Sequence, residues 1–244
     1  MRGYPRYGPW MHVLELWRYP IKSVGGERIE SADVTDCGIS GDRGWGLVDE
    51  ATGNVLTGRR EPRLLMATCR VSNDGTPVTT TPEGAELRTS KDYSAWLGCP
   101  VRLEAAGDEG GTYENPLDAL NDKNWISWQG PGGAWHDSGQ ARVSLVSEAS
   151  LRGWDFRRFR ANVLVSGERE DDLIGREIEM GSARLLVVKG IDRCVMVTRP
   201  QVGLPRDMEI LKAITRQERA TLSIGATVER GGVLQVGDEV RAAG

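Results

Sequence analysis

The sequence is poor in the residues that build metal clusters and disulfide frameworks. Its 244 residues include two histidines and four cysteines, which are Cys37, Cys69, Cys99 and Cys194. No two cysteines form a CxxC pair, so the spacing excludes a zinc knuckle and a dense disulfide scaffold. Free thiols fit a reducing compartment, and we therefore expect a cytoplasmic protein.

Long apolar runs and a surplus of positive charge are also lacking. No stretch approaches the roughly 18 consecutive apolar residues that a membrane span needs. The first ten residues contain no apolar signal core, which predicts that the chain is not secreted. The net charge of −4 disfavours non-specific binding of nucleic acid, because such binding depends on a cationic surface. We expect neither a membrane span nor a nucleic-acid partner.

The sequence does contain many short segments with β-type patterns. Residues 13–17 alternate between apolar and polar side chains, as a half-buried strand does. Further strands are expected at residues 28–35, 45–49, 65–71, 142–146, 161–166, 177–180 and 183–189, and a last hairpin at residues 226–229 and 233–240. Many strands with few helices predict a mainly β (α+β) protein of barrel or sandwich type.

Helices are expected at only three places. Ser90 is a candidate N-cap for a helix at residues 90–97, and Ser147 for a helix at residues 147–154. A third helix is expected at residues 208–217. Between them, residues 105–140 are rich in glycine and hold three tryptophans, which predicts a long loop of either functional or structural character.

One cysteine stands in a setting that suits metal binding. Cys194 follows an apolar strand and the cationic Arg193, which favours the thiolate, the form of cysteine that binds metals. A thiolate suits a soft or high-valent metal centre. From these residues alone, a buried structural cysteine stays the more common alternative.

Several cationic residues stand near glycines or at strand ends, where they suit an anionic ligand. Lys22 and Ser23 precede two glycines, whose backbone N–H groups can approach a phosphate. Arginine is the planar partner of phosphate and carboxylate groups. Candidates of this kind are Arg43, Thr57 with Arg59, and Arg160 with Asn162. Solvated surface charges are the alternative for each of them.

Seven segments in series resemble one family. They are YPIKS (19–23), GDRGW (41–45), LTGRREPRL (56–64), HDSG with LVSEASL (136–151), RFRANVLVSG (158–167), DRCVMVT (192–198) and GGVLQVGDEV (231–240). In this order they resemble MOSC-domain proteins that carry an N-terminal β-barrel domain, such as the mitochondrial amidoxime-reducing components and their bacterial relatives. The stretch from Trp125 to Trp135 has no counterpart in this resemblance.

The resemblance implies a fold and a cofactor. It implies two interlocked β-barrel-like domains with a few short helices, an N-terminal MOSC β-barrel domain at residues 12–100 and a MOSC domain at residues 101–244. It also implies a molybdenum–pterin cofactor whose metal is bound by Cys194. Residues implied around the cofactor are Lys22, Ser23, Arg43, Thr57, Arg59, Arg160, Asn162 and Arg193, with Asp137 and Ser138 near the metal as acid or supporting groups.

The resemblance further implies a molybdenum-dependent oxidoreductase that reduces small N-hydroxylated substrates such as amidoximes and hydroxylamines. No cysteine follows Cys194, so we expect no iron–sulfur cluster in this chain. Electrons are then expected from a separate protein, either a flavoprotein reductase or a heme or iron–sulfur carrier. Two alternatives stay open, a protein that carries sulfur as a persulfide on Cys194 and a cofactor carrier without reductase activity.

Overall fold

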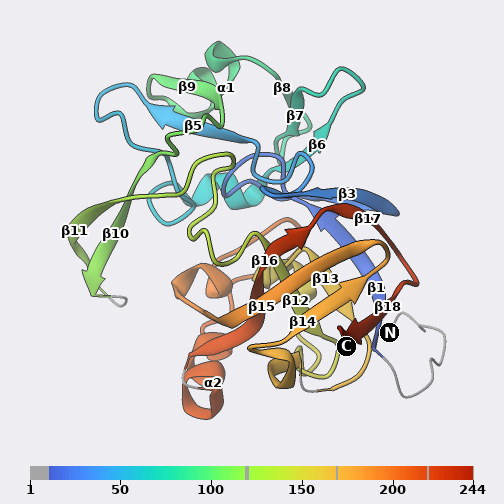
Figure 1. Cartoon of the computed structure of the whole chain (residues 1–244). Coiled ribbons are helices and arrows are strands. Elements are labelled where there is room, and N and C mark those ends of the chain that lie inside the picture. The colour runs from blue at the N-terminus through green and yellow to red at the C-terminus, as the bar shows by residue number, and fades with distance from the viewer. Residues whose placement is uncertain (1–10, 119–120, 169, 219, 244) are drawn as a thin grey trace.

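The computed structural model describes residues 11–118, 121–168, 170–218 and 220–243. Over these residues the chain is mainly β with two α-helices, as the sequence predicts (Figure 1). The strands are β1 (Met11–Arg18), β2 (Glu27–Ile29), β3 (Ser31–Thr35), β4 (Gly38–Ile39), β5 (Trp45–Asp49), β6 (Thr68–Val71), β7 (Pro77–Thr80), β8 (Glu86–Leu87), β9 (Val101–Ala105), β10 (Thr112–Asp118), β11 (Asn121–Gln129), β12 (Val143–Ser147), β13 (Val163–Val165), β14 (Glu177–Met180), β15 (Ala183–Asp192), β16 (Thr221–Arg230), β17 (Gly232–Gln235) and β18 (Glu239–Ala242). The helices are α1 (Ser90–Leu97) and α2 (Glu209–Glu218), with 3₁₀ turns η1 (Pro62–Met66), η2 (Phe156–Phe159), η3 (Glu170–Leu173) and η4 (Val195–Thr198).

The lower half of the molecule in Figure 1 is a closed barrel of seven strands. The strands follow one another in the order β13, β12, β16, β15, β14, β18 and β1, and pairing of β1 with β13 closes the ring. Only β12 and β13 pair in parallel within it. Closure leaves the ring without a free sheet edge.

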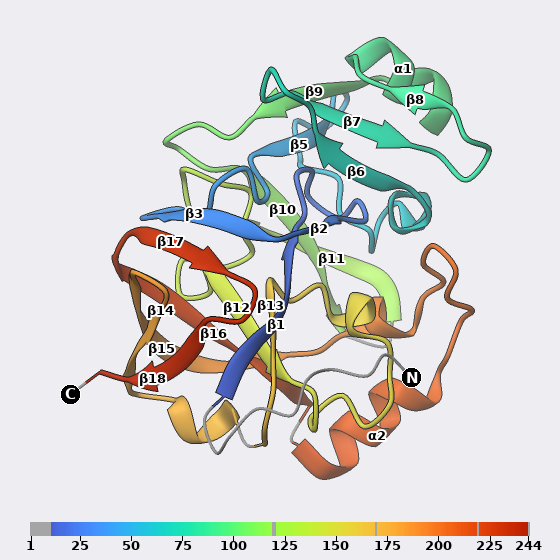
Figure 2. The same cartoon turned by 90° about the vertical axis from the view of Figure 1, so that its right-hand side faces the viewer.

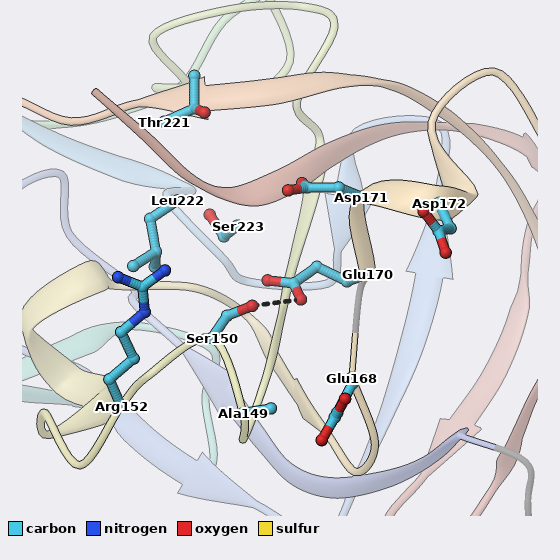
Figure 3. A pocket seen from close by; sticks show the side chains of 10 residues that line it. All are labelled: Ala149, Ser150, Arg152, Glu168, Glu170, Asp171, Asp172, Thr221, Leu222 and Ser223. Carbon is cyan, nitrogen blue, oxygen red and sulfur yellow. Dashed lines mark hydrogen bonds between the residues drawn. The ribbon is translucent and has the colours of Figure 1, made fainter. Parts of the chain in front are cut away.

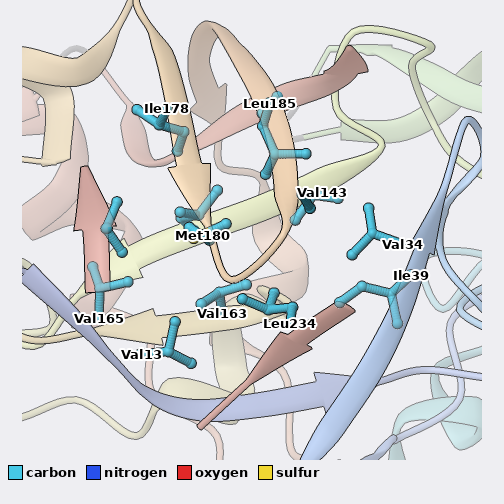
Figure 4. Packing of buried hydrophobic residues seen from close by; sticks show 14 of the residues in the cluster. Val13, Val34, Ile39, Val143, Val163, Val165, Ile178, Met180, Leu185 and Leu234 are labelled. Atoms are coloured by element: carbon cyan, nitrogen blue, oxygen red, sulfur yellow. The ribbon is translucent and has the colours of Figure 1, made fainter. Parts of the chain in front are cut away.

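The interior of the barrel is filled by aliphatic side chains (Figure 4). Alternate residues of a strand point to the same face, so each strand contributes every second side chain to the core. Ile178 and Met180 of β14, for example, are fully buried there and meet Leu185 of β15. These aliphatic side chains fill the interior of the barrel.

The upper half consists of smaller sheets. Strand β5 pairs with β9, and β6, β7 and β8 form a three-stranded sheet. Isolated bridges from Ile21 to Trp45 and from Gly25 to Thr68 tie these sheets to the segment that follows β1. Tyr93 and Leu97 of α1 pack into their common core.

The two halves exchange strands. Strand β1 comes from the N-terminal end of the chain yet belongs to the C-terminal barrel. In return, β17 pairs with β3 of the upper half, and the two strands lie side by side in Figure 2. The segments that leave β1 and enter η4 are therefore held at the junction between the halves.

The structure corrects four details of the sequence prediction. Helix α1 is capped by Thr89 rather than Ser90, because Thr89 forms a capping box with Asp92. Ser147 ends β12 and residues 148–153 form turns instead of a helix, since Gly153 and the residue before it have positive φ angles. Strand β16 pairs with β12 and β15, and β17 with β3, so the expected last hairpin does not form.

The fourth correction concerns the tryptophan-rich segment. Residues 105–140 contain the antiparallel hairpin β10–β11, in which Tyr113 lies opposite Trp128. Such cross-strand aromatic pairs stabilise a hairpin despite flanking glycines. The hairpin projects from the side of the molecule in Figure 1. No described helix has the length and apolarity to cross a membrane.

Candidate functional site

Two loops of the upper half place cationic side chains next to each other. The backbone N–H of Arg43 donates to the carbonyl of Tyr19 at 2.7 Å, and that of Lys22 to the carbonyl of Trp45 at 2.9 Å. These bonds fasten the loop after β1 to the loop before β5. Lys22 and Ser23 are buried there, beside Arg43.

A third segment adds the acidic residue of the site. The backbone N–H of Trp135 donates to the Arg43 carbonyl at 2.7 Å, which brings the following residues to the two loops. Lys22 Nζ then forms an ion pair of 2.5 Å with Asp137 Oδ1, and the Asp137 side chain is 75% exposed. Ser138 lies beside it, and its Oγ accepts a backbone N–H within the local turn.

Two arginines flank one aromatic ring. The guanidinium carbons of Arg43 and Arg160 lie 5.1 Å and 4.5 Å from the centroid of the Tyr19 ring. Arg43 also pairs with the buried Asp42 and donates to the carbonyl of Arg160 at 3.0 Å. Arg160 Nη1 donates to the Val24 carbonyl at 2.7 Å. Contacts across Tyr19 thus join both halves of the molecule.

Burial perturbs the acid–base properties of this cluster. It lowers the pKa of Lys22, and attraction to Asp137 opposes that effect. Burial, together with repulsion from Arg43, lowers the pKa of Arg160 to about 10. Burial acts on Arg43 in the same direction, but Asp42 outweighs it and the pKa of Arg43 is raised. Arg43 and Arg160 therefore stay cationic near neutral pH.

Arg193 supports the segment that carries Cys194. Its Nε donates to the Leu222 carbonyl at 2.7 Å and its Nη1 to the Phe159 carbonyl at 2.8 Å, while Nη2 bonds to Ser223 Oγ. Burial lowers the pKa of Arg193 to about 10, and the nearby Cys194, Tyr19 and Arg43 also act on it electrostatically. The guanidinium is therefore bonded to protein groups and holds its neighbour Cys194 in place.

Cys194 itself is partly exposed and begins η4 without a capping bond from its side chain. The loop that holds Thr57 and Arg59 lies against this turn. Arg199 Nη1 donates to the Gly58 carbonyl at 3.2 Å, and a Cβ added at Gly58 would lie 2.6 Å from Met196 Cε. The structure thus brings Thr57 and Arg59 to the cysteine turn.

Asn162 lies close to the cluster, but its side chain is bonded within the barrel. Its Oδ1 accepts bonds from Ser144 N at 3.1 Å and Ser144 Oγ at 2.9 Å, and its Nδ2 donates to the Trp17 carbonyl at 3.3 Å. Asn162 is 1% exposed. Its amide therefore joins the ends of β1, β12 and β13 instead of facing a ligand.

Unfavourable backbone conformations gather at this junction. Six non-glycine residues of the described chain have positive φ angles, among them Ser23 (68°), Arg43 (51°) and Arg160 (52°). Two others of the six, Ala220 and Ser223, accept hydrogen bonds from Arg193. L-residues adopt this region at a cost, and such residues cluster at functional sites.

Two buried polar atoms beside the cluster have no hydrogen-bond partner in the described structure. They are Arg160 Nη2 and the hydroxyl of Tyr113. Tyr113 comes from β10, and Lys22 Nζ lies 4.8 Å from the centroid of its ring. Buried polar atoms are normally bonded, so unpaired ones next to several cations fit a site for an anionic ligand.

Sequence reasoning missed Tyr19, Asp42 and Tyr113. Tyr19 begins the YPIKS segment and Asp42 precedes Arg43, so their neighbours in sequence held a signal. No sequence signal pointed to Tyr113, because its contact with Lys22 joins residues that are 91 positions apart.

Two cavities differ sharply in their charge. A cavity of about 90 Å³ borders the cluster at Tyr19 and Arg160. A larger one of about 360 Å³ borders Leu222 and Ser223, the partners of Arg193, and is lined by Arg152 and by four acidic residues, Glu168, Glu170, Asp171 and Asp172 (Figure 3). Glu170 there accepts bonds of 2.6 Å from the hydroxyls of Ser147 and Ser150. Its acidic lining disfavours an anionic ligand.

The fold and this junction define a class of β proteins with a charged site between two halves. Residues 10–108 match the model of the MOSC N-terminal beta barrel domain, and residues 134–241 match that of the MOSC domain. The chain therefore belongs to the MOSC-domain proteins, a family associated with the binding or processing of the molybdenum cofactor.

Individual relatives fall into two groups. The chain is 26% identical to mitochondrial amidoxime reducing component 2 of Bos taurus over 93% of its own length and 82% of that protein. It is also 26% identical to molybdenum cofactor sulfurase 2 of Aedes aegypti, over 91% of its own length but only 32% of that protein. Among solved structures, the YUAD protein from Bacillus subtilis aligns over 94% of this chain with 15% identity and a TM-score of 0.44.

Proposed function

We propose that this chain is an oxidoreductase that holds a molybdenum–pterin cofactor and reduces small N-hydroxylated substrates. The observation that carries the proposal is the imbalance of charge at the junction. Four cationic side chains, Lys22, Arg43, Arg160 and Arg193, are gathered with three carboxylates that act on them, those of Asp42, Asp137 and Asp192. An uncompensated buried charge is costly, and an anionic ligand relieves that cost.

The residues present fit such a cofactor. Its phosphate needs cations and N–H donors, which Lys22, Arg43 and the unpaired Nη2 of Arg160 supply. Its metal needs a soft ligand, and the partly exposed Cys194 offers its sulfur at the same junction. When bound, the cofactor would supply the two-electron reduction.

The other residues then act by orienting these groups. Asp42 fixes the guanidinium of Arg43, and Asp137 fixes the ammonium of Lys22. The pKa of Asp137 is lowered, because attraction to Lys22 and Arg43 outweighs the opposing effect of the surrounding protein. Asp137 is then ionised near neutral pH, so we assign it an orienting role rather than that of an acid. Asn162 and Arg193 stabilise the backbone around the site.

Conversion of a hydroxylamine to an amine consumes two electrons and two protons and releases water. The described residues include no cluster of histidine, cysteine or acidic side chains suited to a further metal centre. We therefore propose that the electrons come from a separate flavoprotein reductase, or from a heme or iron–sulfur carrier. Resemblance to the amidoxime-reducing components supports this arrangement.

A direct test compares the purified protein with its Cys194→Ala variant. With a reduced viologen dye as electron donor, the wild type should convert benzamidoxime to benzamidine, and the variant should lose that activity at least a hundredfold. Equal turnover by both proteins would refute the role of Cys194. A wild type loaded with cofactor but inert toward every N-hydroxylated substrate would refute the proposed reaction.

The similarity to the molybdenum cofactor sulfurases favours a second candidate. In that case Cys194 would carry sulfur as a persulfide, which its partial exposure permits. Mass spectrometry distinguishes the two functions. A mass increase of one sulfur atom on Cys194, removed by a thiol reductant and found in protein without molybdenum, would favour the sulfur carrier.

A further inference from the structure

The tryptophan-rich hairpin β10–β11 reaches the cationic site through one residue. Tyr113 of β10 is completely buried, and Lys22 Nζ lies over its ring at 4.8 Å from the centroid. Its hydroxyl is one of the buried polar atoms without a partner in the described structure. Neither family model covers this residue, since the matches end at residue 108 and resume at residue 134.

The ring of Tyr113 is firmly positioned. Trp128 of β11 stacks on it with centroids 4.7 Å apart, and a Cβ added at Gly130 would lie 2.1 Å from its Cε2. Trp135 packs in the same apolar cluster. A large side chain held this tightly presents its hydroxyl at a fixed point, where the charges of Asp137 and Arg43 act on it.

The hairpin is also fastened to the loop next to the cysteine turn. Arg60 Nε bonds to Glu114 of β10 at 3.1 Å, and the Arg60 guanidinium lies 3.7 Å from the ring centroid of Trp125 in β11. The hairpin thus contacts two segments that carry proposed cofactor ligands, at Lys22 and at Thr57 to Arg60. These contacts with the site, together with the pairing of β10 with β11, fix the position of the hairpin.

We infer that Tyr113 is a further cofactor-binding residue, whose hydroxyl donates a hydrogen bond to an anionic oxygen of the ligand that Lys22 neutralises. The inference rests on the proposed function. A phenol donates only while protonated, and burial together with the nearby Asp137 raises the pKa of Tyr113. A buried donor without a partner weakens the fold of the free protein. A hydrogen bond to the ligand would give the Tyr113 hydroxyl the partner that it lacks within the described part of the protein.

The experiment compares Tyr113→Phe with the matched control Tyr93→Phe. Tyr93 is equally buried, but its hydroxyl bonds to Thr79 Oγ1 at 2.7 Å, away from the site. The first readout is the rate at which freshly purified protein releases its pterin during dialysis, followed by fluorescence of the oxidised pterin. The second is the melting temperature of protein made in a host that cannot synthesise the pterin.

Tyr113→Phe should release the pterin about five to ten times faster than the wild type, as expected for the loss of one hydrogen bond. Without cofactor it should melt at or above the wild-type temperature, because no protein bond is lost. Tyr93→Phe should show the reverse, with wild-type pterin release and a melting temperature lowered by a few degrees.

The possible failures are distinguishable. If the wild type holds pterin and Tyr113→Phe releases it at the same rate, the inference is overturned and the proposed function stands. A lower melting temperature of cofactor-free Tyr113→Phe would assign the hydroxyl a structural role and also overturn it. If the wild type holds no pterin, the proposed function fails and the inference fails with it.

Discussion

The interior of the barrel and the junction above it are built on opposite principles. The barrel core is made of aliphatic side chains from alternate strand positions. Those in Figure 4 pack against one another and, being apolar, require no hydrogen bond or ion pair. The junction buries Lys22 beside arginines, in segments where Ser23, Arg43 and Arg160 have positive φ angles. Burial of apolar surface stabilises the fold, whereas buried charge and backbone strain weaken it. The stability of the barrel therefore offsets the free-energy cost of the site.

Asn162 gives the largest expected effect on stability, because it lies at the site but is bonded as part of the barrel. Replacement by alanine leaves Ser144 and the Trp17 carbonyl without their partner, and should lower the free energy of unfolding by about 2 kcal/mol. Urea denaturation measures this loss. A Ser144→Ala/Asn162→Ala double variant should lose less than the sum of the single variants.

The same comparison predicts that folded Asn162→Ala still retains its pterin. Loss of pterin without loss of stability would show that Asn162 binds the ligand and does not stabilise the barrel.

Acid should weaken the junction before it affects the barrel. Burial lowers the pKa of His136 to about 3, against about 6.5 in an unfolded chain. Between these values the unfolded chain binds the proton and the folded one does not, so stability falls as the pH falls. From pH 6.5 to pH 5 the loss should reach roughly 1.5 kcal/mol.

Urea denaturation of the wild type and of His136→Gln at a series of pH values measures this loss. The slope between pH 6.5 and pH 5 should flatten in the variant. An identical slope in both proteins would show that another group causes the acid sensitivity.

Lys22→Met should have the smallest effect on stability and a large one on binding. Methionine fills the buried position without a charge, and Asp137 is exposed enough for water to replace its partner. The free energy of unfolding should therefore change by less than about 1 kcal/mol. Retention of pterin should fall at least tenfold. A marked loss of stability with unchanged retention would make Lys22 a structural residue.

Local pattern was sufficient for much of the fold. The hairpin of β14 and β15 and the helix α2 follow from apolar periodicity and lie where the sequence predicted them. Local pattern could not predict that β17 leaves its neighbour β16 for β3, because that pairing joins residues about 200 positions apart. Nor could glycine-rich flanks indicate the hairpin β10–β11, which depends on aromatic contacts across the strands.

The site was also predictable only in part, because a motif identifies a residue but not the contacts of its side chain. The resemblance pointed to Lys22, Arg43, Arg160 and Cys194 as ligand groups, and the structure gathers their segments at one junction. The resemblance could not separate side chains that have free polar atoms from those already bonded within the protein, as Asn162 is. Nor could composition tell the cysteines apart, although burial raises the pKa of Cys69 to about 12 and thereby keeps its sulfur protonated.

We propose that the surplus of positive charge at the junction serves a molybdenum–pterin cofactor attached through Cys194. Elemental analysis of freshly purified protein, combined with oxidative release of the pterin, tests it most directly. The account predicts about one molybdenum and one pterin per chain, with the metal lost from Cys194→Ala. Protein from a cofactor-producing host that contains neither, or a variant that keeps its full metal content, would contradict the account.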